Sequence, residues 1–511
     1  MMNSARTRCL DIGAKLLAVT SAVYFFSFVT ADPDLWGHIK FGQDLWHAKG
    51  LVRADPYSFT AYGQPWINHE WLAELIFFAV YRYLGDAGLL FGKLCIGVFI
   101  VAILSKICTF RKQRPLVFAL VVVPAILVIS PGFMIRPQIF SFLFFSLFLY
   151  VLHRYFAQRK NLLFLMPCLM ALWVNLHGGF LVGLTILGTV AVWETLAHFV
   201  LGKKNNAPKT LWLWFLVTSA ATLLNPYGYN LPVFLYETLS VPRRISEWNP
   251  VSLTDLSHLP LKLLAVLFLA TLLAKPKQRE GWEITAIAMT LVASMLHRRH
   301  MPFFGITVAP YLVFRLSTIV SEIQVRFPKL ILAKVSQNLV AIFFGVLVAY
   351  QTYSGVHRYV MANCRIIVDP QTYPVAAVRF LKANKIKGNL LLPFDWGEHA
   401  IWHLYPGCMV SIDGRFRTVY PESVIQDHFI ADDDRTRWQG LIGKYPSDIL
   451  LAPQVPFFQT LIQQESPWVY VYSDPIAIIF VRNSNKNMEA LKRFRTGRFE
   501  YPTSPPSVYF P

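Results

Sequence analysis

Long apolar runs separated by short polar segments fill the chain up to about residue 353. A helix needs about 17–25 residues to cross a bilayer, and roughly eleven of the runs approach this length. They lie near residues 11–30, 87–109, 115–131, 138–157, 161–176, 179–200, 209–225, 259–274, 281–296, 303–320 and 336–353. This pattern predicts an α-helical polytopic membrane protein with about eleven transmembrane helices.

The polar segments between these runs are basic at regular intervals. The basic clusters are Arg6 with Arg8 and residues 106–114, 154–160, 203–209, 275–279 and 326–334. All of them fall on one side of the membrane if the N-terminus is cytoplasmic, as the positive-inside rule requires. This topology needs residues 71–86 to form an interfacial or re-entrant helix that does not cross. If that segment crossed, the basic loops would change sides.

The pattern changes after about Gly355, where the apolar spans stop. Amphipathic helices are expected at 372–384, after Gly397, near 421–430 and at 434–443, alternating with strands at 389–393, 408–412, 447–452, 467–472 and 475–482. This alternation predicts a small α/β domain at residues 355–511, which follows a membrane domain at residues 1–354. The topology places this domain and the first loop, residues 31–86, on the outer side.

The composition argues against a soluble globular protein, because 55% of the residues are hydrophobic, 15% are charged and the mean hydropathy is +0.42. The formal net charge of +19 is carried by the short clusters between spans, which is typical of membrane topology and not of nucleic-acid binding. We therefore expect a multi-pass protein of the cytoplasmic (inner) membrane, surrounded by lipid bilayer and without a nucleic-acid partner. The first apolar run is expected to be an uncleaved helix rather than a signal peptide.

The six cysteines show no metal-ligand spacing. Cys364 and Cys408 both fall on the outer side, where a disulfide is chemically allowed. Two unpaired thiols are at least as good an interpretation, so the sequence leaves their state open.

The loop at residues 31–86 concentrates ionisable side chains beside the first span. Asp32 before Pro33 is expected to cap one helix, and Asn68 is expected to cap a second one. One interpretation is that the carboxylates here only cap helices and complement the helix dipole. We favour catalysis, because so many carboxylates and imidazoles at a membrane surface are costly unless they are used. The predicted catalytic residues are Asp34, Glu70, His69, His38 and Asp32.

Further polar groups come from outer loops that are far apart in the sequence. PGFMIRPQ has an arginine at a helix start, NLHGGF has a histidine between two spans, and HRRHMPFF is a basic cluster that departs from the positive-inside trend. A phosphate is a natural counter-charge for such a cluster, whereas snorkelling arginines, a structural histidine or lipid head groups are the alternatives. The predicted donor-phosphate-binding residues are Arg136, His177, His297, Arg298, Arg299 and His300.

Aromatic and acidic side chains near these groups are candidates for substrate contacts. The extended polar loop VPRRISEWNP also carries Arg243 and Arg244, and the motifs PFDWGEHAIWHLYP and SIDGRFRTVYPE of the C-terminal domain bring further charges, although Asp413-Gly414 is equally well a simple turn. We expect the catalytic and phosphate-binding residues to border one cavity, as a single active site requires. The predicted substrate-contacting residues are Trp36, Asp55, Trp66, Glu247 and Trp248.

The motifs DPDLW, HEWL, RPQ, NLHGG, NPYG, DWG and IDGR, spread over nearly the whole chain, resemble those of bacterial C-type (GT-C) membrane glycosyltransferases. The likeness is to family 39 and to arabinosyl and mannosyl transferases, which use polyprenyl-phosphate-linked sugars. The resemblance implies a GT-C fold, and it places the family's outer-loop acid, a general base or metal-linked group, on Asp34 or Asp32. The second acidic position is His69-Glu70 instead of an Asp pair, which leaves the cofactor unknown, with a divalent metal possible.

The sequence thus predicts a glycosyltransferase with a polyprenyl-phosphate-linked sugar as donor and a glycan, lipid or protein as acceptor. A carboxylate would assist attack by the acceptor hydroxyl, and positive charge would stabilise the leaving lipid phosphate. Two alternatives stay open: a transporter or flippase of lipid-linked glycans, and a glycan polymerase or ligase. Few charges lie within the spans and no internal repeat is found, which argues against a transporter.

Overall fold

The computed structural model describes residues 2–111, 113–203, 207–239, 245–274, 280–326, 334–433, 437–454, 458, 467–502 and 508–511. Arg243, Arg244 and the basic residues at 204–206, 275–279 and 327–333 therefore lie outside the described residues. The chain divides into two compact units. The first unit consists of Met1–Phe28 with Leu90–Cys364, and the second consists of Val29–Leu89 with Arg365–Pro511.

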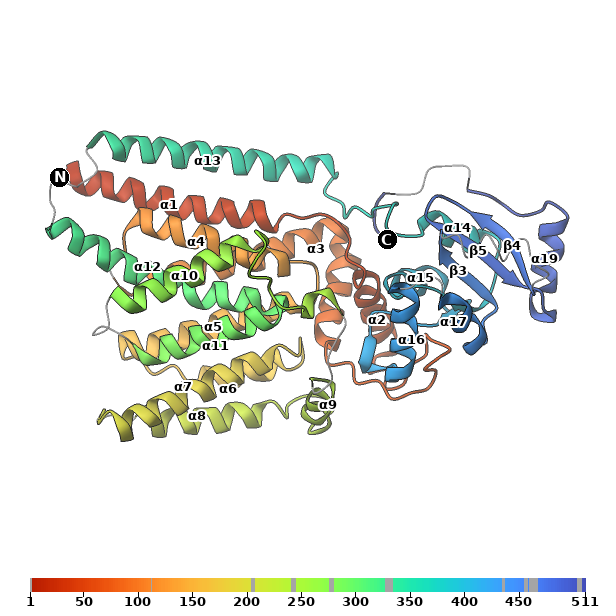
Figure 1. Ribbon diagram of the computed structural model, residues 1–511, viewed down its shortest axis with the longest axis horizontal. Helices are drawn as coiled ribbons and strands as arrows, with labels where there is room; N and C mark the ends of the chain where they lie inside the picture. Colours follow the sequence, from red (N-terminus) through yellow and green to blue (C-terminus); the bar gives the residue numbers. More distant parts are fainter. Residues whose placement is uncertain are drawn as a thin grey trace. The chain divides into compact units, whose positions relative to one another are not determined.

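The first unit consists of helices, most of which run side by side (Figure 1). They are α1 (Met2–Phe26), the second half of α3 (Trp71–Cys108), α4 (Pro115–Ile129), α5 (Gln138–Gln158), α6 (Leu165–Trp173), α7 (Phe180–Val200), α8 (Ala207–Ala221), α9 (Asn230–Leu239), α10 (Leu259–Ala274), α11 (Gly281–Leu296), α12 (Met301–Arg326) and α13 (Lys334–Met361). Each apolar run that was expected to span the membrane overlaps one of these helices.

Length and composition allow some of these described helices, fewer than the eleven that the sequence predicts, to span a membrane. In the part of the chain that the structure describes, seven helices are long and apolar enough to cross a bilayer, and α10 and α11 are shorter apolar helices. Large apolar side chains such as Leu213, Leu263 and Leu273 are exposed on the protein surface, which suits contact with lipid and not with water. The chain is therefore a multi-pass helical membrane protein, as the sequence predicts.

Small residues allow the helices to pack closely. Ala14, Ala18 and Ala22 recur every four residues along α1, and all three are buried. Residues four apart lie on one face of a helix, so these alanines form a face that allows close helix approach. α1 packs against α4 and α13. In a membrane the hydrophobic effect does not hold helices together, so close van der Waals packing of small residues stabilises their association.

The long helix α3 is interrupted at Gly85, which has φ 62° and ψ −158°. Glycine adopts this positive φ without the steric penalty that a Cβ atom would bring. Residues 71–84 are thus a helical segment separate from the apolar run that follows. That residues 71–86 do not cross the bilayer stays a prediction.

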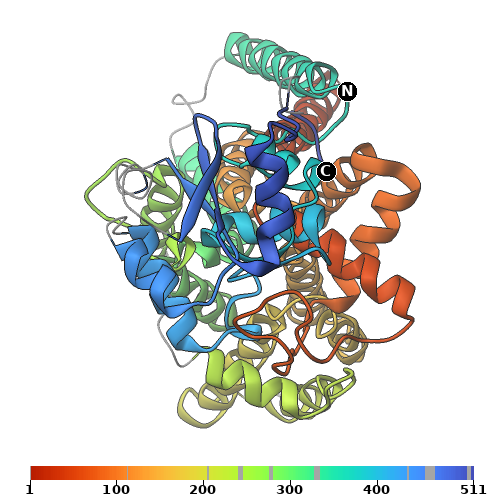
Figure 2. The same cartoon turned by 90° about the vertical axis from the view of Figure 1, so that its right-hand side faces the viewer.

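A five-stranded sheet forms the centre of the second unit among its described residues, with the strand order β2-β1-β3-β5-β4 (Figure 2). β1 is parallel to β2 and β3, whereas β5 is antiparallel to β3 and β4. The strands are β1 (Gly388–Leu391), β2 (Cys408–Val410), β3 (Ile449–Pro453), β4 (Trp468–Ser473) and β5 (Ala477–Arg482). All five overlap the strands that alternation in the sequence predicts.

Helices cover both faces of this sheet. On one face, Trp438 and Leu441 of α17 (Trp438–Lys444) join Leu450 and Phe480 in one apolar cluster, together with Ala431 of α16 (Glu422–Asp433). On the other face, Phe380 of α14 (Val375–Ala383) stacks on Tyr472 with ring centroids 4.6 Å apart. A register shift between Tyr470 and Tyr472 turns Tyr472 to this second face. The remaining helices are α15 (Gly397–Leu404) and α19 (Met488–Arg495).

The first loop packs into this α/β unit. α2 (Leu35–Ala48) lies against α15, and the backbone N–H of Phe59 donates to the carbonyl of Val410 in β2 at 3.0 Å. Thr30 and Ile367 form a parallel β-bridge. The sequence predicts that residues 31–86 belong to the membrane domain, whereas contacts in the structure group residues 29–89 with residues 365–511.

His428 of α16 should make the second unit less stable in acid. Its Nδ1 bonds the carbonyl of Val424 at 2.8 Å, and its buried Nε2 has no hydrogen-bond partner among the described residues. Burial lowers the pKa of His428 to about 4, whereas an unfolded histidine takes up a proton below about pH 6.5. Between these values the unfolded state binds more protons, so the free energy of unfolding falls as the pH falls.

We expect the loss at pH 5 from this one side chain to be about 2 kcal/mol. The substitution His428→Leu should therefore reduce the difference in unfolding free energy between pH 7 and pH 5 by about that amount. His47→Leu, at an exposed position on α2, is the matched control and should leave the difference unchanged. Chemical unfolding at the two pH values measures it, and equal pH dependence in both variants would contradict the assignment.

Candidate active site

Arginine and histidine side chains from three separate segments lie near Glu247, which belongs to a fourth segment of the first unit. Arg136 precedes α5, His177 lies between α6 and α7, Glu247 is in the turn η2 (Ser246–Trp248), and Arg299 is in the turn η4 (Arg298–His300). Arg136 Nη1 lies 2.9 Å and Arg299 Nη1 lies 3.9 Å from the two oxygens of Glu247. Arg299 Nη2 lies 3.2 Å from His177 Nε2. We call Arg136, His177, Glu247 and Arg299 the basic cluster.

The hydrogen bonds of His177 indicate where its proton lies. Nδ1 accepts from the backbone N–H of Gly179 at 3.0 Å and lies 2.7 Å from Ser141 Oγ, which itself accepts from Trp173 Nε1 at 2.7 Å. With Nδ1 as the acceptor, a neutral ring carries its proton on Nε2. Nε2–H and the Arg299 guanidinium are then two donors that face each other. An oxygen acceptor shared by both, such as one of a phosphate, would satisfy this arrangement.

The other residues predicted to bind phosphate surround Trp248. The rings of His297 and His300 lie 5.2 Å and 5.9 Å from that of Trp248, and the Arg299 guanidinium lies 5.7 Å from it. Arg298 differs, because its Nε donates to the carbonyl of Pro250 at 3.3 Å. Glu247 therefore joins Arg136 to Arg299, and Arg299 in turn contacts His177. The two histidines His297 and His300 pack against the tryptophan.

The predicted catalytic residues lie in the second unit, and their helices begin later than expected. α2 begins at Leu35 with Asp34 at its N-cap, and Asp32 Oδ1 accepts the N–H of Asp34 at 3.1 Å. The expectation that Asp32 caps this helix is thus wrong by two residues. Asn68 likewise precedes α3, and its side chain accepts the N–H of Glu70 at 3.2 Å. Local side-chain bonds to the backbone displace both helix starts.

Glu398 of α15 lies beside the start of α2. Its Oε2 accepts the N–H of Gly37 at 3.0 Å, and a Cβ atom at Gly37 would overlap the carboxyl group. A Cβ at Gly414 would contact both Glu398 and Asp34. Burial first, and then the charges of Asp34 and Asp413, raise the pKa of Glu398 well above its usual range. A protonated Glu398 removes one negative charge from beside Asp34.

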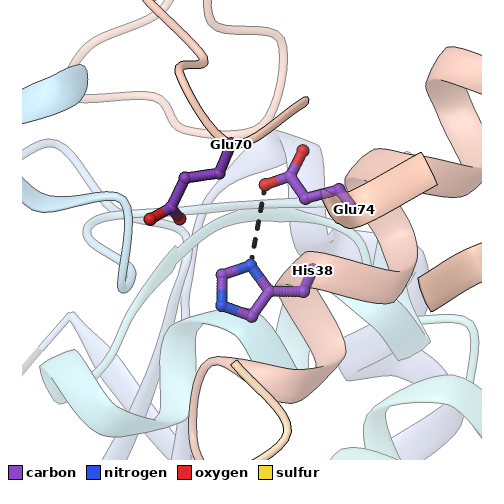
Figure 3. Close-up of side chains that lie close together, drawn as sticks. All are labelled: His38, Glu70 and Glu74. Atoms are coloured by element: carbon purple, nitrogen blue, oxygen red, sulfur yellow. Dashed lines mark ion pairs between the residues drawn. The ribbon is translucent and has the colours of Figure 1, made fainter. Parts of the chain in front are cut away.

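His38, Glu70 and Glu74 converge from α2 and the start of α3 (Figure 3). His38 Nδ1 lies 3.6 Å from Glu74 Oε1, and one donor atom of each residue lies within 4.8 Å of the others. His69 Nε2 lies 3.6 Å from Glu70 Oε1. Burial lowers the pKa of His38, but the carboxylates of Glu74, Glu70 and Asp34 together raise it above its ordinary value. One imidazole and two carboxylates are a donor set that suits a divalent metal.

Asp55 and Trp66 occupy structural positions around a buried arginine. Arg415 donates to Asp413 at 2.8 and 2.6 Å and to Asp55 at 2.6 Å, and its guanidinium lies 5.0 Å from the centroids of both the Tyr57 and Trp66 rings. Asp55 is 2% and Trp66 is 3% exposed. This burial favours a structural role for both over the predicted substrate contact.

Trp36 is also enclosed by protein. It is 0% exposed, and its ring packs against Tyr373, His399 and Phe510 at centroid distances of 4.8, 5.0 and 5.5 Å. Its burial again favours packing over substrate contact. Trp36, Asp55 and Trp66 are predicted to contact substrate because they are aromatic or acidic. Side chains of the same types also occur in the protein core, so residue type alone does not separate the two roles.

Two contributors were missed by the sequence analysis. Glu74 is not among the predicted site residues, although its i,i+4 spacing from Glu70 places both on one side of a helix start. Ser141, which links Trp173 to His177, carries no signal in the sequence at all. The predicted single cavity would combine residues of both units, and it stays a prediction.

Neither a protein-family model nor a curated protein matches the sequence. Solved structures do resemble the fold. The oligosaccharyltransferase AglB from Archaeoglobus fulgidus has a TM-score of 0.58 at 12% identity, over 87% of this chain and 69% of AglB. ArnT from Cupriavidus metallidurans in the apo state has a TM-score of 0.51 at 14% identity, over 91% of this chain and 96% of ArnT.

A third similar structure is the arabinofuranosyltransferase AftD from Mycobacteria, with a TM-score of 0.51 at 15% identity over 94% of this chain and 40% of AftD. The chain has the GT-C fold. At these identities the likeness concerns the fold alone, so the chemistry of this GT-C protein rests on its own residues.

Removal of the Arg415 guanidinium should destabilise the second unit. Arg415→Met leaves Asp55 and Asp413 buried without a counter-charge, so we expect unfolding free energy to fall by about 3–5 kcal/mol. Lys486→Met is the control, because Lys486 is exposed and pairs with Asp448 at the surface; such a pair is worth about 0–1 kcal/mol. Unfolding in detergent measures both. A stable Arg415→Met protein with reduced turnover would instead support substrate contact by this region.

Proposed function

We propose that the protein is a glycosyltransferase that moves a sugar from a polyprenyl-phosphate-linked donor to a glycan, lipid or protein acceptor. It would act at the outer face of the cytoplasmic membrane, with the N-terminus inside and residues 365–511 outside. The facing donors of His177 and Arg299 carry this proposal. The fold supports transfer over transport, since the similar structures are transferases, and AglB was solved in complex with an inhibitory peptide and a dolichol-phosphate.

The basic cluster has the chemistry for a lipid-linked phosphate. Arg136 and Arg299 together bring two positive charges against one negative charge from Glu247, and His177 adds a further hydrogen-bonding group. Negative charge grows on the phosphate as the bond to the sugar breaks, and donors fixed in advance stabilise that charge most. Ser141 and Gly179 fix the His177 ring, so its Nε2–H would keep its direction during the reaction.

The second requirement is a base for the acceptor hydroxyl. Asp34 is at the N-cap of α2 but makes no side-chain capping bond. Its immediate surroundings contain Glu398, whose pKa is raised well above its usual range by burial and by the neighbouring carboxylates. Two carboxyl groups in different environments are the arrangement in which one can serve as a base. We assign the general base to Asp34 and give Asp32, whose Oδ1 binds the backbone N–H of Asp34, a positioning role.

Arg299→Gln should weaken the binding of a polyprenyl phosphate. The loss of a charged hydrogen bond is worth about 1.5–3 kcal/mol, which corresponds to about a 10- to 100-fold weaker affinity. Arg298→Gln is the matched comparison on the same turn, and we expect a smaller loss because Arg298 bonds the carbonyl of Pro250. Binding of undecaprenyl phosphate in nanodiscs measures both. Equal losses of affinity in the two variants would mean that the arginines act only through the general charge of the surface, and not through a specific phosphate contact by Arg299.

Asp34→Asn should abolish most of the transfer while sparing the fold. The substitution keeps size and capping ability but removes the base, which costs about 10²–10⁴ in rate. Asp32→Asn should change the rate little, since an asparagine oxygen can still accept the N–H of residue 34. Turnover and lipid-phosphate binding are compared at matched expression. Mild and equal effects would move the search for the base to Glu70.

A further inference from the structure

The separation of the His38 and Glu74 side chains differs from that of a hydrogen-bonded pair. His38 Nδ1 lies 3.6 Å from Glu74 Oε1, which is longer than the roughly 2.7–3.2 Å of an N–H···O hydrogen bond. Two ligands of a tetrahedral zinc ion, at bond lengths of about 2.1 Å, lie about 3.4 Å apart. The observed separation therefore fits two ligands of one ion better than a hydrogen-bonded pair.

The burial of His38 gives an independent sign of a missing ligand. His38 is 8% exposed, and its Nδ1 has no hydrogen-bond partner among the described residues. A buried polar atom without a partner costs about 1–3 kcal/mol. The imidazole points toward Glu70 and Glu74 (Figure 3), so an ion between them would satisfy this atom.

The surroundings hold Glu74 in the orientation that a ligand needs. Asn68 Nδ2 donates to Glu74 Oε2 at 2.6 Å, and Glu74 Oε1 is the oxygen that faces His38. A hydrogen bond to the outer oxygen of a carboxylate ligand is the usual way in which a protein orients it. Glu70 is less buried than Glu74, and one of its carboxylate oxygens lies within 4.8 Å of the donor atoms of His38 and Glu74.

We propose that His38, Glu70 and Glu74 form a binding site for a divalent transition-metal ion, with Zn²⁺ bound more tightly than Mn²⁺ and Mg²⁺ bound weakest. An imidazole nitrogen with two carboxylates suits Zn²⁺, whereas Mg²⁺ prefers oxygen ligands and keeps its waters. Three protein ligands leave a position for water or substrate. When bound, the ion would supply fixed positive charge among carboxylates that otherwise repel one another. This inference does not depend on the proposed sugar transfer.

The test uses the full chain, purified in detergent without a polyhistidine tag and stripped of metal. Titration with Zn²⁺ alone should show one tight equivalent by calorimetry, and metal analysis after desalting should recover it. His38→Gln and Glu74→Gln should weaken Zn²⁺ binding by at least about 100-fold, and Glu70→Gln by about 10-fold. Glu70 is partly exposed, so this third variant keeps the test valid if the buried substitutions unfold the protein.

Matched controls are His47→Gln, exposed on the same helix, and Glu489→Gln, exposed on α19. Both should bind Zn²⁺ as the unaltered protein does. Absence of a tight equivalent, or equal binding by Glu70→Gln, His38→Gln and the controls, would overturn the metal site. Intact Zn²⁺ binding without sugar transfer would count against the proposed function and leave the metal site standing.

Discussion

The buried ion triad of Asp55, Arg415 and Asp413 is the interaction on which the second unit depends. Its members are 2%, 6% and 0% exposed. Arg415 bonds both Asp413 and Asp55, and Asp55 lies 360 positions before Arg415 in the sequence. Three charges out of water are stable only when each is paired and hydrogen-bonded, and here the guanidinium bonds both carboxylates. The triad thereby fixes the first loop to the C-terminal α/β domain. α2, which carries Asp34 and His38, is anchored by the same contact region.

The contacts of the first loop indicate a structural role for the C-terminal α/β domain. Residues 29–89 are inserted between α1 and the second half of α3, yet they pack with residues 365–511. Phe59 bonds the backbone of β2, α2 packs on α15, and Gly37 is needed for the close approach of Glu398. Functional side chains need rigid support to keep their geometry. The α/β domain supplies that support to the loop, so it acts as a scaffold and not merely as an appended module.

The elements could be predicted from the sequence because each leaves a local signal. Each apolar run expected to span the membrane overlaps a helix, although only seven of the described helices are long and apolar enough to cross a bilayer. Alternation predicted all five described strands. The pairing of Asp55 with Arg415 leaves no such signal, since a buried ion pair between distant residues has no period or spacing. For the same reason Asp413-Gly414 could equally be interpreted as a turn. The predicted start of α2 was wrong by two residues. The side chain of Asp32 accepts the backbone N–H of Asp34 ahead of the helix, a bond that an aspartate can make without being the helix N-cap.

Candidate site residues were predictable by type but not by role. Arg136, His177 and Arg299 are predicted as phosphate-binding groups on the outer side. In the structure Glu247, a predicted substrate contact, joins the two arginines, and Arg299 contacts His177. The role of each depends on which atom of His177 carries the proton, and that follows from Gly179 and Ser141, not from the histidine. A sequence shows which side chains can hold charge or a proton. Only their neighbours in the fold decide whether a given group donates, accepts or serves as a counter-charge, and the facing donors of His177 and Arg299 are the case in which that decision points to an anion.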